Sequence, residues 1–268
     1  MNFKSHGRPC PLKLDTNRKG DRLLFPEKQE KGTTGKGDRL LFKERHMPRI
    51  ARGLSDGSVF HVINRGNGRQ EVFHKRGDYY AFTCAIEEAV ECFDVKILAY
   101  CLMPNHFHLL LQPERGGELI KFMQWLMTSH VRRYHRHYGT SGHVWQGRYK
   151  SFIVQEDDHL LTVARYVEGN PVRAGLAKSA RNWNWSSHRE RIGRNVCKML
   201  SELPVPSCGD WTEYVDTAMT SSEVERLRRS VNRQAPFGKD DWVQKLCDDL
   251  GLVSTIRERG RPRGKLKK

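Results

Sequence analysis

Hydrophobic and polar positions in the middle of the chain fall into blocks that have the lengths of single strands and helices. In four short blocks, apolar residues either alternate with polar ones or run without a break, which predicts β-strands. In three other blocks they recur every three or four residues, which predicts helices. The predicted strands are 58–65, 95–104, 106–113 and 149–155, and the predicted helices are 78–92, 118–138 and 157–169.

The order of these elements is strand, helix, strand, strand, helix, strand, followed by one further helix. Such a βαββαβ order is typical of the ferredoxin-like arrangement. We therefore expect an α+β fold in which helices cover one face of an antiparallel four-stranded sheet, with a C-terminal helical and basic tail. The other face of the sheet is expected to be open for function.

The segments that flank this unit differ from it in composition. The first contains 12 basic and 6 acidic residues, few core-forming residues and two copies of KGDRLLF, and we interpret it as an upstream extension. A polar stretch around Ser221 resembles a linker, and two helical patterns follow it. The expected parts are a disordered leader at 1–46, the main domain at 47–220, a small helical DNA-binding unit at 221–256 and a disordered basic tail at 257–268.

Composition and charge narrow the function classes. No stretch approaches the ~20 apolar residues of a membrane span, and the first residues lack the apolar core of a signal peptide, so we expect neither insertion nor secretion. Lys and Arg total 47 against 31 acidic residues, and the net charge of +16 favours a polyanionic partner such as nucleic acid. The seven cysteines include no CxxC pair, which predicts reduced thiols rather than a zinc finger or a disulfide framework.

Two histidines in the third predicted strand form a candidate metal site. Because side chains alternate along a strand, His106 and His108 share one face, while Phe107 points to the other. Two neighbouring imidazoles can hold one divalent ion and leave positions for a third ligand, water and a phosphate oxygen. Such pairs also occur by chance in a chain with 12 histidines, so a solvated pair is the alternative.

A tyrosine and an asparagine at the end of the last helix of this unit form a second candidate constellation. Tyr166 and Asn170 are four residues apart, so both project from one face if the helical turn continues. A phenol and a carboxamide then share a surface. Gly169 and Pro171 argue against a continuous helix, and a lone helical tyrosine is most often a core residue.

Basic and aromatic residues near these motifs are candidates for nucleic-acid contacts, because arginines follow phosphates while aromatic rings stack on bases. Some have structural alternatives, since Arg65 would also brace a turn and Trp145 would also fit a core. The Gly-Arg-Pro sequence at 260–262 resembles an AT-hook core, which binds the minor groove. The predicted DNA-binding residues are Arg65, Trp145, Arg148, Lys150, Arg173, Arg259, Arg261 and Arg263, with Tyr149 as a second candidate for stacking.

Four separated motifs, in this order, resemble the REP-associated tyrosine transposases, which are relatives of the single-tyrosine insertion-sequence transposases among the HUH endonucleases. The motifs are MPRIARGLSDGSVFHVINRGN, LMPNHFHLLLQP, VWQGRYKSF and ARYVEGNPVRAGL. The resemblance runs from about Met47 to Arg189, just over half of the chain. The C-terminal block that begins PFGKDDWVQKL is similar to the tail of the longer members.

This resemblance implies a metal-dependent endonuclease and strand transferase that cleaves and rejoins single-stranded or hairpin DNA through a 5′-phosphotyrosine. It implies that Tyr166 is the nucleophile and that His106, His108 and Asn170 hold one Mg²⁺ or Mn²⁺ ion. It further implies a monomer or homodimer in the bacterial cytoplasm, associated with the nucleoid.

Two other functions remain as alternatives. A noncatalytic or domesticated nucleic-acid-binding regulator could use the same fold, although the presence of both histidines and the tyrosine argues against it. A metal-dependent hydrolase could use the histidines with water as the nucleophile. In that case Tyr166 is dispensable and no covalent adduct forms.

Overall fold

The computed structural model describes residues 53–194, 199–206 and 209–257. The predicted leader lies outside these ranges, as do Arg259, Arg261 and Arg263 of the predicted tail. The disorder and the DNA contacts expected of them therefore stay predictions.

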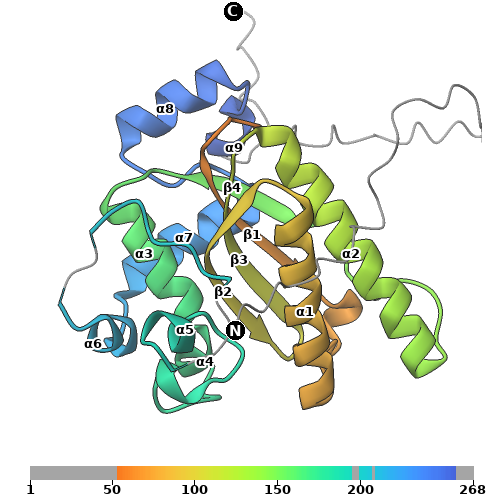
Figure 1. Ribbon diagram of the computed structural model, residues 1–268. Helices are drawn as coiled ribbons and strands as arrows, with labels where there is room; N and C mark the ends of the chain where they lie inside the picture. Colours follow the sequence, from red (N-terminus) through yellow and green to blue (C-terminus); the bar gives the residue numbers. More distant parts are fainter. Residues whose placement is uncertain (1–52, 195–198, 207–208, 258–268) are drawn as a thin grey trace, which may run out of the picture. The chain divides into compact units, whose positions relative to one another are not determined.

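Four strands form one antiparallel sheet in the spatial order β2-β3-β1-β4 (Figure 1). This order places the first and third strands in the centre and the second and fourth at the edges, as in a ferredoxin-like sheet. The predicted α+β class and all four predicted strands are thereby confirmed. The strands are β1 (Val59–Arg65), β2 (Val95–Met103), β3 (His106–Pro113) and β4 (Lys150–Val154).

The two helices that connect the strands, α1 (Arg76–Cys92) and α2 (Gly116–Tyr138), cover one face of the sheet (Figure 1). Phe82 of α1 and Phe122 of α2 are fully buried there, in one cluster with Phe107 of β3. Because side chains alternate along β3, the histidines on either side of Phe107 face the other way.

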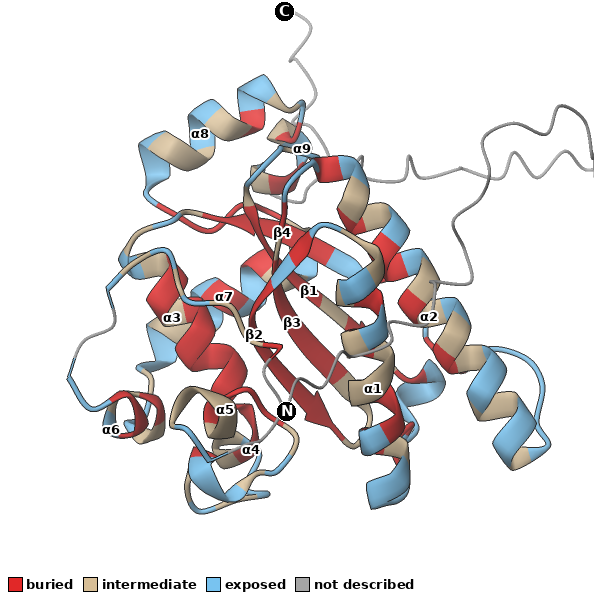
Figure 2. Cartoon of the chain, viewed as in Figure 1, coloured by how far each residue is buried: buried red, intermediate tan, exposed pale blue. Residues whose placement is uncertain are grey.

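The second face of the sheet is covered as well, which corrects the expectation that it is open. Helix α3 (Asp158–Glu168) packs on it through a buried apolar stripe that includes Leu160 and Val163. The strands are buried almost throughout (Figure 2). The sequence of β2 agrees with this, since it is a continuous apolar run from Ile97 to Met103. Such a run is typical of a strand that is covered on both faces.

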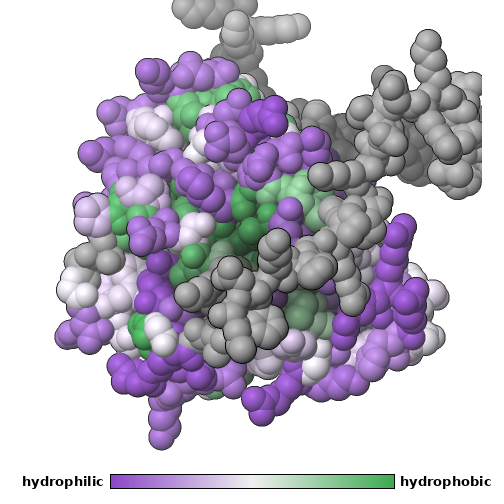
Figure 3. Space-filling model, viewed as in Figure 1, coloured by the Kyte–Doolittle hydropathy of each residue, from purple (hydrophilic) through white to green (hydrophobic). Residues whose placement is uncertain are grey.

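The remaining helices follow α3. They are the short α4 (Asn170–Arg173), α5 (His188–Arg191) and α6 (Trp211–Asp216), then α7 (Ser221–Arg233), α8 (Asp240–Asp249) and α9 (Val253–Ile256), with 3-10 turns at Asn67–Arg69 and Ala180–Asn182. None of the helices in the described ranges has the length and apolar character needed to span a membrane. Hydrophilic side chains make up most of the surface seen in Figure 3, with apolar patches between them.

The predicted boundary after residue 220 does not separate two units. The described residues from 53 to 257 belong to one compact unit, in which Leu227 of α7 is fully buried in the cluster that also contains α3. Phe237, after α7, exchanges backbone hydrogen bonds with Ile153 and Gln155 beside β4. The polar stretch is a helix start instead of a linker, because the Thr220 side chain caps α7.

Among the cysteines in the described ranges, one differs from expectation. Cys84, Cys101 and Cys247 are free thiols. Cys92, the last residue of α1, is disulfide-bonded, so the prediction that the cysteines are reduced is wrong for this residue.

Candidate active site

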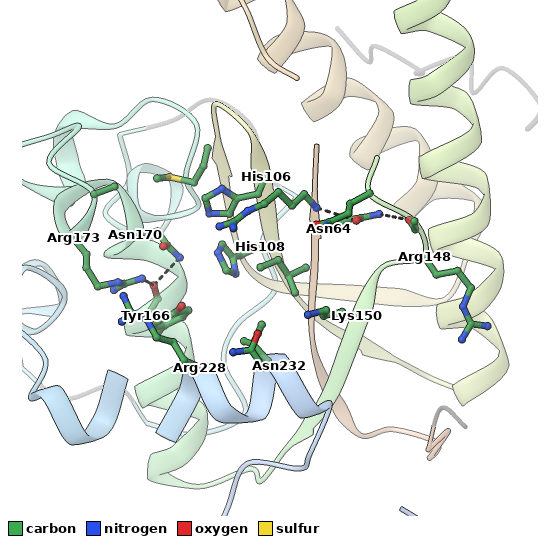
Figure 4. Close-up of a pocket in the computed structure, with 17 residues that line it drawn as sticks. Asn64, His106, His108, Arg148, Lys150, Tyr166, Asn170, Arg173, Arg228 and Asn232 are labelled. Atoms are coloured by element: carbon green, nitrogen blue, oxygen red, sulfur yellow. Dashed lines mark hydrogen bonds between the residues drawn. The ribbon is translucent and has the colours of Figure 1, made fainter. Parts of the chain in front are cut away.

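A pocket of about 610 Å³ lies on the second sheet face, where strands β1, β3 and β4 meet helices α3, α4 and α7 (Figure 4). Its charged side chains are all basic, and no described residue that lines it carries a carboxylate. A concave surface of this kind concentrates anions. The basic residues are Arg65, Arg148, Lys150, Arg173 and Arg228.

Strand register brings the two predicted histidines to this pocket. In the pairing of β3 with β1, His106 lies opposite Arg65 and His108 lies opposite Ile63. Their ring centroids are 5.1 Å apart, and both rings line the pocket. The prediction that they share one face is confirmed.

The surroundings of the two histidines favour the neutral form that binds metals. Burial lowers the pKa of His106 to about 4, with smaller contributions from Arg65 and Arg173, and burial lowers the pKa of His108 well below its ordinary value. In the tautomer that leaves each Nε2 available, His106 donates from Nδ1 to Asn105 Oδ1 at 2.6 Å. The Nδ1 of His108 then donates to His61 Nε2 at 2.9 Å.

His61 is a site residue that sequence analysis missed. It is fully buried on β1, and its ring stacks on His108 with centroids 5.0 Å apart and planes 19° apart. Burial lowers the pKa of His61 to about 3, so the ring is a neutral hydrogen-bond acceptor. The alternation in SVFHVINR places it on the face of Arg65, but only the strand order reveals that β1 lies beside β3.

Helix α3 places Tyr166 against the histidines. Its ring is 7% exposed and meets the His108 ring edge-on, with centroids 5.7 Å apart. On the other side, the Arg173 guanidinium carbon lies 4.0 Å from the centroid of the Tyr166 ring. The ring is therefore fixed between a histidine and a cation, at the border of a basic pocket.

Asn170 reaches the same place although α3 ends at Glu168. Gly169 keeps helical torsion angles (φ −82°, ψ 0°), so a helical turn continues across the break between α3 and α4. The Asn170 Nδ2 donates to the carbonyl oxygen of Tyr166 at 3.2 Å. Its Oδ1 accepts no hydrogen bond from any residue in the described ranges and remains available as an oxygen donor.

A family model described as "Transposase IS200 like" matches residues 55–170, a span that holds both histidines, Tyr166 and Asn170. Residues 55–170 are therefore similar to an IS200-like transposase domain. The chain is also 28% identical over 121 residues to a Haemophilus influenzae protein that is named as a REP-associated tyrosine transposase. That match covers 41% of this chain and 68% of the relative, and it confirms the resemblance seen in the four motifs.

Two solved structures are similar to this chain. One is titled "Structure of the REP associates tyrosine transposase bound to a REP hairpin"; it is 18% identical, with a TM-score of 0.47, and the match covers 61% of this chain and 98% of that one. The other is a protein of Deinococcus radiodurans described as a transposase; it is 19% identical, with a TM-score of 0.33, and the match covers 45% and 95%.

The structure places the predicted DNA-binding residues in two different environments. Arg65, Arg148, Lys150 and Arg173 all line the pocket. Trp145 is 5% exposed and packs against Phe107, Phe82 and His130 in the core. Tyr149 is 8% exposed in the same cluster, and both residues also line a groove beside α2, so the prediction that these two rings stack on bases stays a prediction.

Helix α7 contributes residues to the pocket that sequence analysis assigned to a separate unit. Arg228 and Asn232 extend from α7 toward Tyr166 (Figure 4). Burial, and to a smaller degree the charge of Arg228, lowers the pKa of Arg173. Two guanidinium groups held near each other without a carboxylate in the pocket lining form a site suited to a phosphate.

A buried carboxylate fixes the end of the helix that carries Tyr166. Glu168 is fully buried and accepts hydrogen bonds from Ser187 Oγ at 2.6 Å and Trp211 Nε1 at 2.7 Å. It also contacts His188 Nδ1 and Arg191 Nε, each at 3.1 Å. Burial alone raises the pKa of Glu168, but these partners outweigh it and lower the pKa, so the carboxylate stays charged.

Proposed function

We propose that this protein cleaves and rejoins single-stranded or hairpin DNA, with Tyr166 as the nucleophile and a 5′-phosphotyrosine as the intermediate. The observation that carries the proposal is the meeting of Tyr166, His106 and His108 in one basic pocket. The basic side chains of the pocket attract the phosphate backbone, and the neutral histidines offer nitrogen ligands for a metal ion. The phenol supplies an oxygen nucleophile.

The residues fit one divalent metal ion, Mg²⁺ or Mn²⁺. No cluster of three His, Cys, Asp or Glu side chains suited to a metal occurs among the described residues, so His106 and His108 need the Asn170 amide oxygen as a third donor. Nitrogen and neutral oxygen donors favour Mn²⁺ over Mg²⁺. A bound ion would polarise the phosphodiester and stabilise the negative charge that develops during the reaction.

The protein's own groups account for the remaining steps. The Tyr166 oxygen attacks phosphorus, the bond from phosphorus to the 3′-oxygen of the preceding nucleotide breaks, and that oxygen takes up a proton while the phenol proton leaves to solvent. Arg173 and Arg228 hold phosphate on the tyrosine side of the pocket, and Lys150 does so beside His108. A 3′-hydroxyl can later attack the phosphotyrosine and rejoin DNA, because the ester bond is retained in the intermediate.

The proposal is tested with an end-labelled hairpin that has single-stranded flanks, incubated with the protein and Mn²⁺. The REP hairpin is the first DNA to try, because the Haemophilus relative is named as REP-associated. We expect a protein–DNA adduct that survives denaturation and a second fragment with an extendable 3′-hydroxyl. Cleavage without an adduct would instead support a hydrolase that uses water, and binding without cleavage would support a regulator.

The hydrogen bond from His108 to His61 makes a prediction about a positioning residue. His61→Phe keeps a ring against Phe152 but removes the acceptor, so we expect a 10- to 100-fold increase (an order-of-magnitude expectation) in the Mn²⁺ concentration needed for half-maximal cleavage. His61→Gln restores an acceptor near the same position and should recover most of the loss. The measurement is single-turnover cleavage against Mn²⁺ concentration, with thermal melting as a control. An unchanged Mn²⁺ dependence in His61→Phe would show that His61 only fills space.

A further inference from the structure

A second concave surface lies on the other side of the same sheet end and has a different chemistry. It is a groove of about 660 Å³ between α2 and residues 142–149. Its walls include the partly buried apolar side chains of Ile120, Met127 and Val131 on one face of α2. Gln124 and Thr128, on the same helix, add exposed polar groups.

The groove is continuous with the catalytic pocket. Asn64, Gly147 and Arg148 line both, so these three residues form the ridge between them. The Asn64 Nδ2 donates to the Gly147 carbonyl oxygen at 3.0 Å, which ties the end of β1 to the loop before β4. Gly147 has a φ of 141°, a conformation that L residues rarely adopt, and its position adds no side chain to the ridge. A strand of DNA can therefore cross at this point.

The charges around the groove match a nucleotide. Arg148 on the ridge and Arg132 on α2 are exposed, and no described residue that lines the groove is acidic. A nucleotide combines a flat base, which prefers apolar contacts, with a phosphate, which prefers arginine. Methionine adapts to surfaces of different shape, so Met127 can pack against any of the four bases.

We propose that this groove binds an unpaired nucleobase of the same DNA strand, close to the phosphate that enters the catalytic pocket. The inference rests on the proposed function for the identity of the ligand, single-stranded DNA. It does not require cleavage, because binding in the groove precedes the chemical step. An apolar peptide or a second copy of the chain would gain nothing from the arginines at the ridge and on α2.

The test uses binding alone, so that its failure is distinct from a failure to cleave. A series of hairpins with single-stranded flanks is prepared, and each hairpin has one abasic site, at a different position near the phosphate that enters the catalytic pocket. The affinity of each hairpin is measured with Tyr166→Phe protein in the absence of metal. We expect one position at which loss of the base weakens binding by about tenfold, the scale of one stacked base.

Thr128→Trp then fills the groove from an exposed position on α2, and Gln244→Trp adds the same bulk to the exposed face of α8 as a matched control. We expect Thr128→Trp to bind the intact hairpin more weakly, and to bind the abasic and intact hairpins with equal affinity. The Gln244→Trp control should bind the intact hairpin as the unchanged protein does, and should still bind the abasic hairpin more weakly. The proposal is overturned if no abasic position matters, or if the abasic site weakens binding equally in the Thr128→Trp protein and the control.

Discussion

Tyr166→Phe is expected to abolish the covalent DNA adduct and to lower strand cleavage by more than about 10³-fold, the scale of loss when a covalent nucleophile is removed. The substitution removes only the phenolic oxygen. The ring keeps its contacts with His108 and with the Arg173 guanidinium, so hairpin affinity should change by less than about threefold. The measurement is adduct yield on a denaturing gel with a labelled hairpin and Mn²⁺.

The matched control for this experiment is Tyr214→Phe, a partly buried tyrosine on α6 whose ring contacts Arg165 away from the pocket. Its adduct yield should equal that of the unchanged protein. An adduct of normal yield in Tyr166→Phe would assign the nucleophile to another residue, and peptide mapping of that adduct would identify it.

His106→Ala and His108→Ala are each expected to lower cleavage by about 10²- to 10³-fold, because one ion needs both imidazoles. The double variant should be little worse than either single variant, since the first substitution already removes the ion. His106 is the cleaner position because it is partly exposed, whereas His108 is buried against His61. Single-turnover rates with saturating Mn²⁺ measure the effect.

His137→Ala is the control for general loss of imidazole, because His137 is exposed at the end of α2. Its cleavage rate should be unchanged. Cleavage that continues in EDTA, or losses in the two single variants that multiply in the double variant, would contradict a shared metal ion.

Local periodicity was sufficient to predict the sheet and to group the main candidate site residues. Alternation along β3 placed His106 and His108 together, and a spacing of four placed Asn170 beside Tyr166. Both inferences depend only on the geometry of a single element. For the same reason the strands and helices of the βαββαβ unit could be placed from the sequence.

The missed features depend on contacts between distant parts of the chain. His61 contacts His108 because β1 lies beside β3, and Arg228 joins the pocket because Leu227 anchors α7 in the core beside α3. Neither contact has a signal in local spacing. Polar residues around Thr220 have the composition of a linker and of a helix cap alike, so composition could not decide between a domain boundary and one compact unit.

The buried Glu168 also sets a condition on any exchange of α3 between two copies of the protein. Lending α3 to a second molecule would withdraw this carboxylate from Ser187, His188, Arg191 and Trp211, all of its own chain. Separating a buried charge from its partners costs about 3–5 kcal/mol. An exchange of α3 between two molecules would therefore be tolerated only if each molecule offers the same four partners to the incoming Glu168.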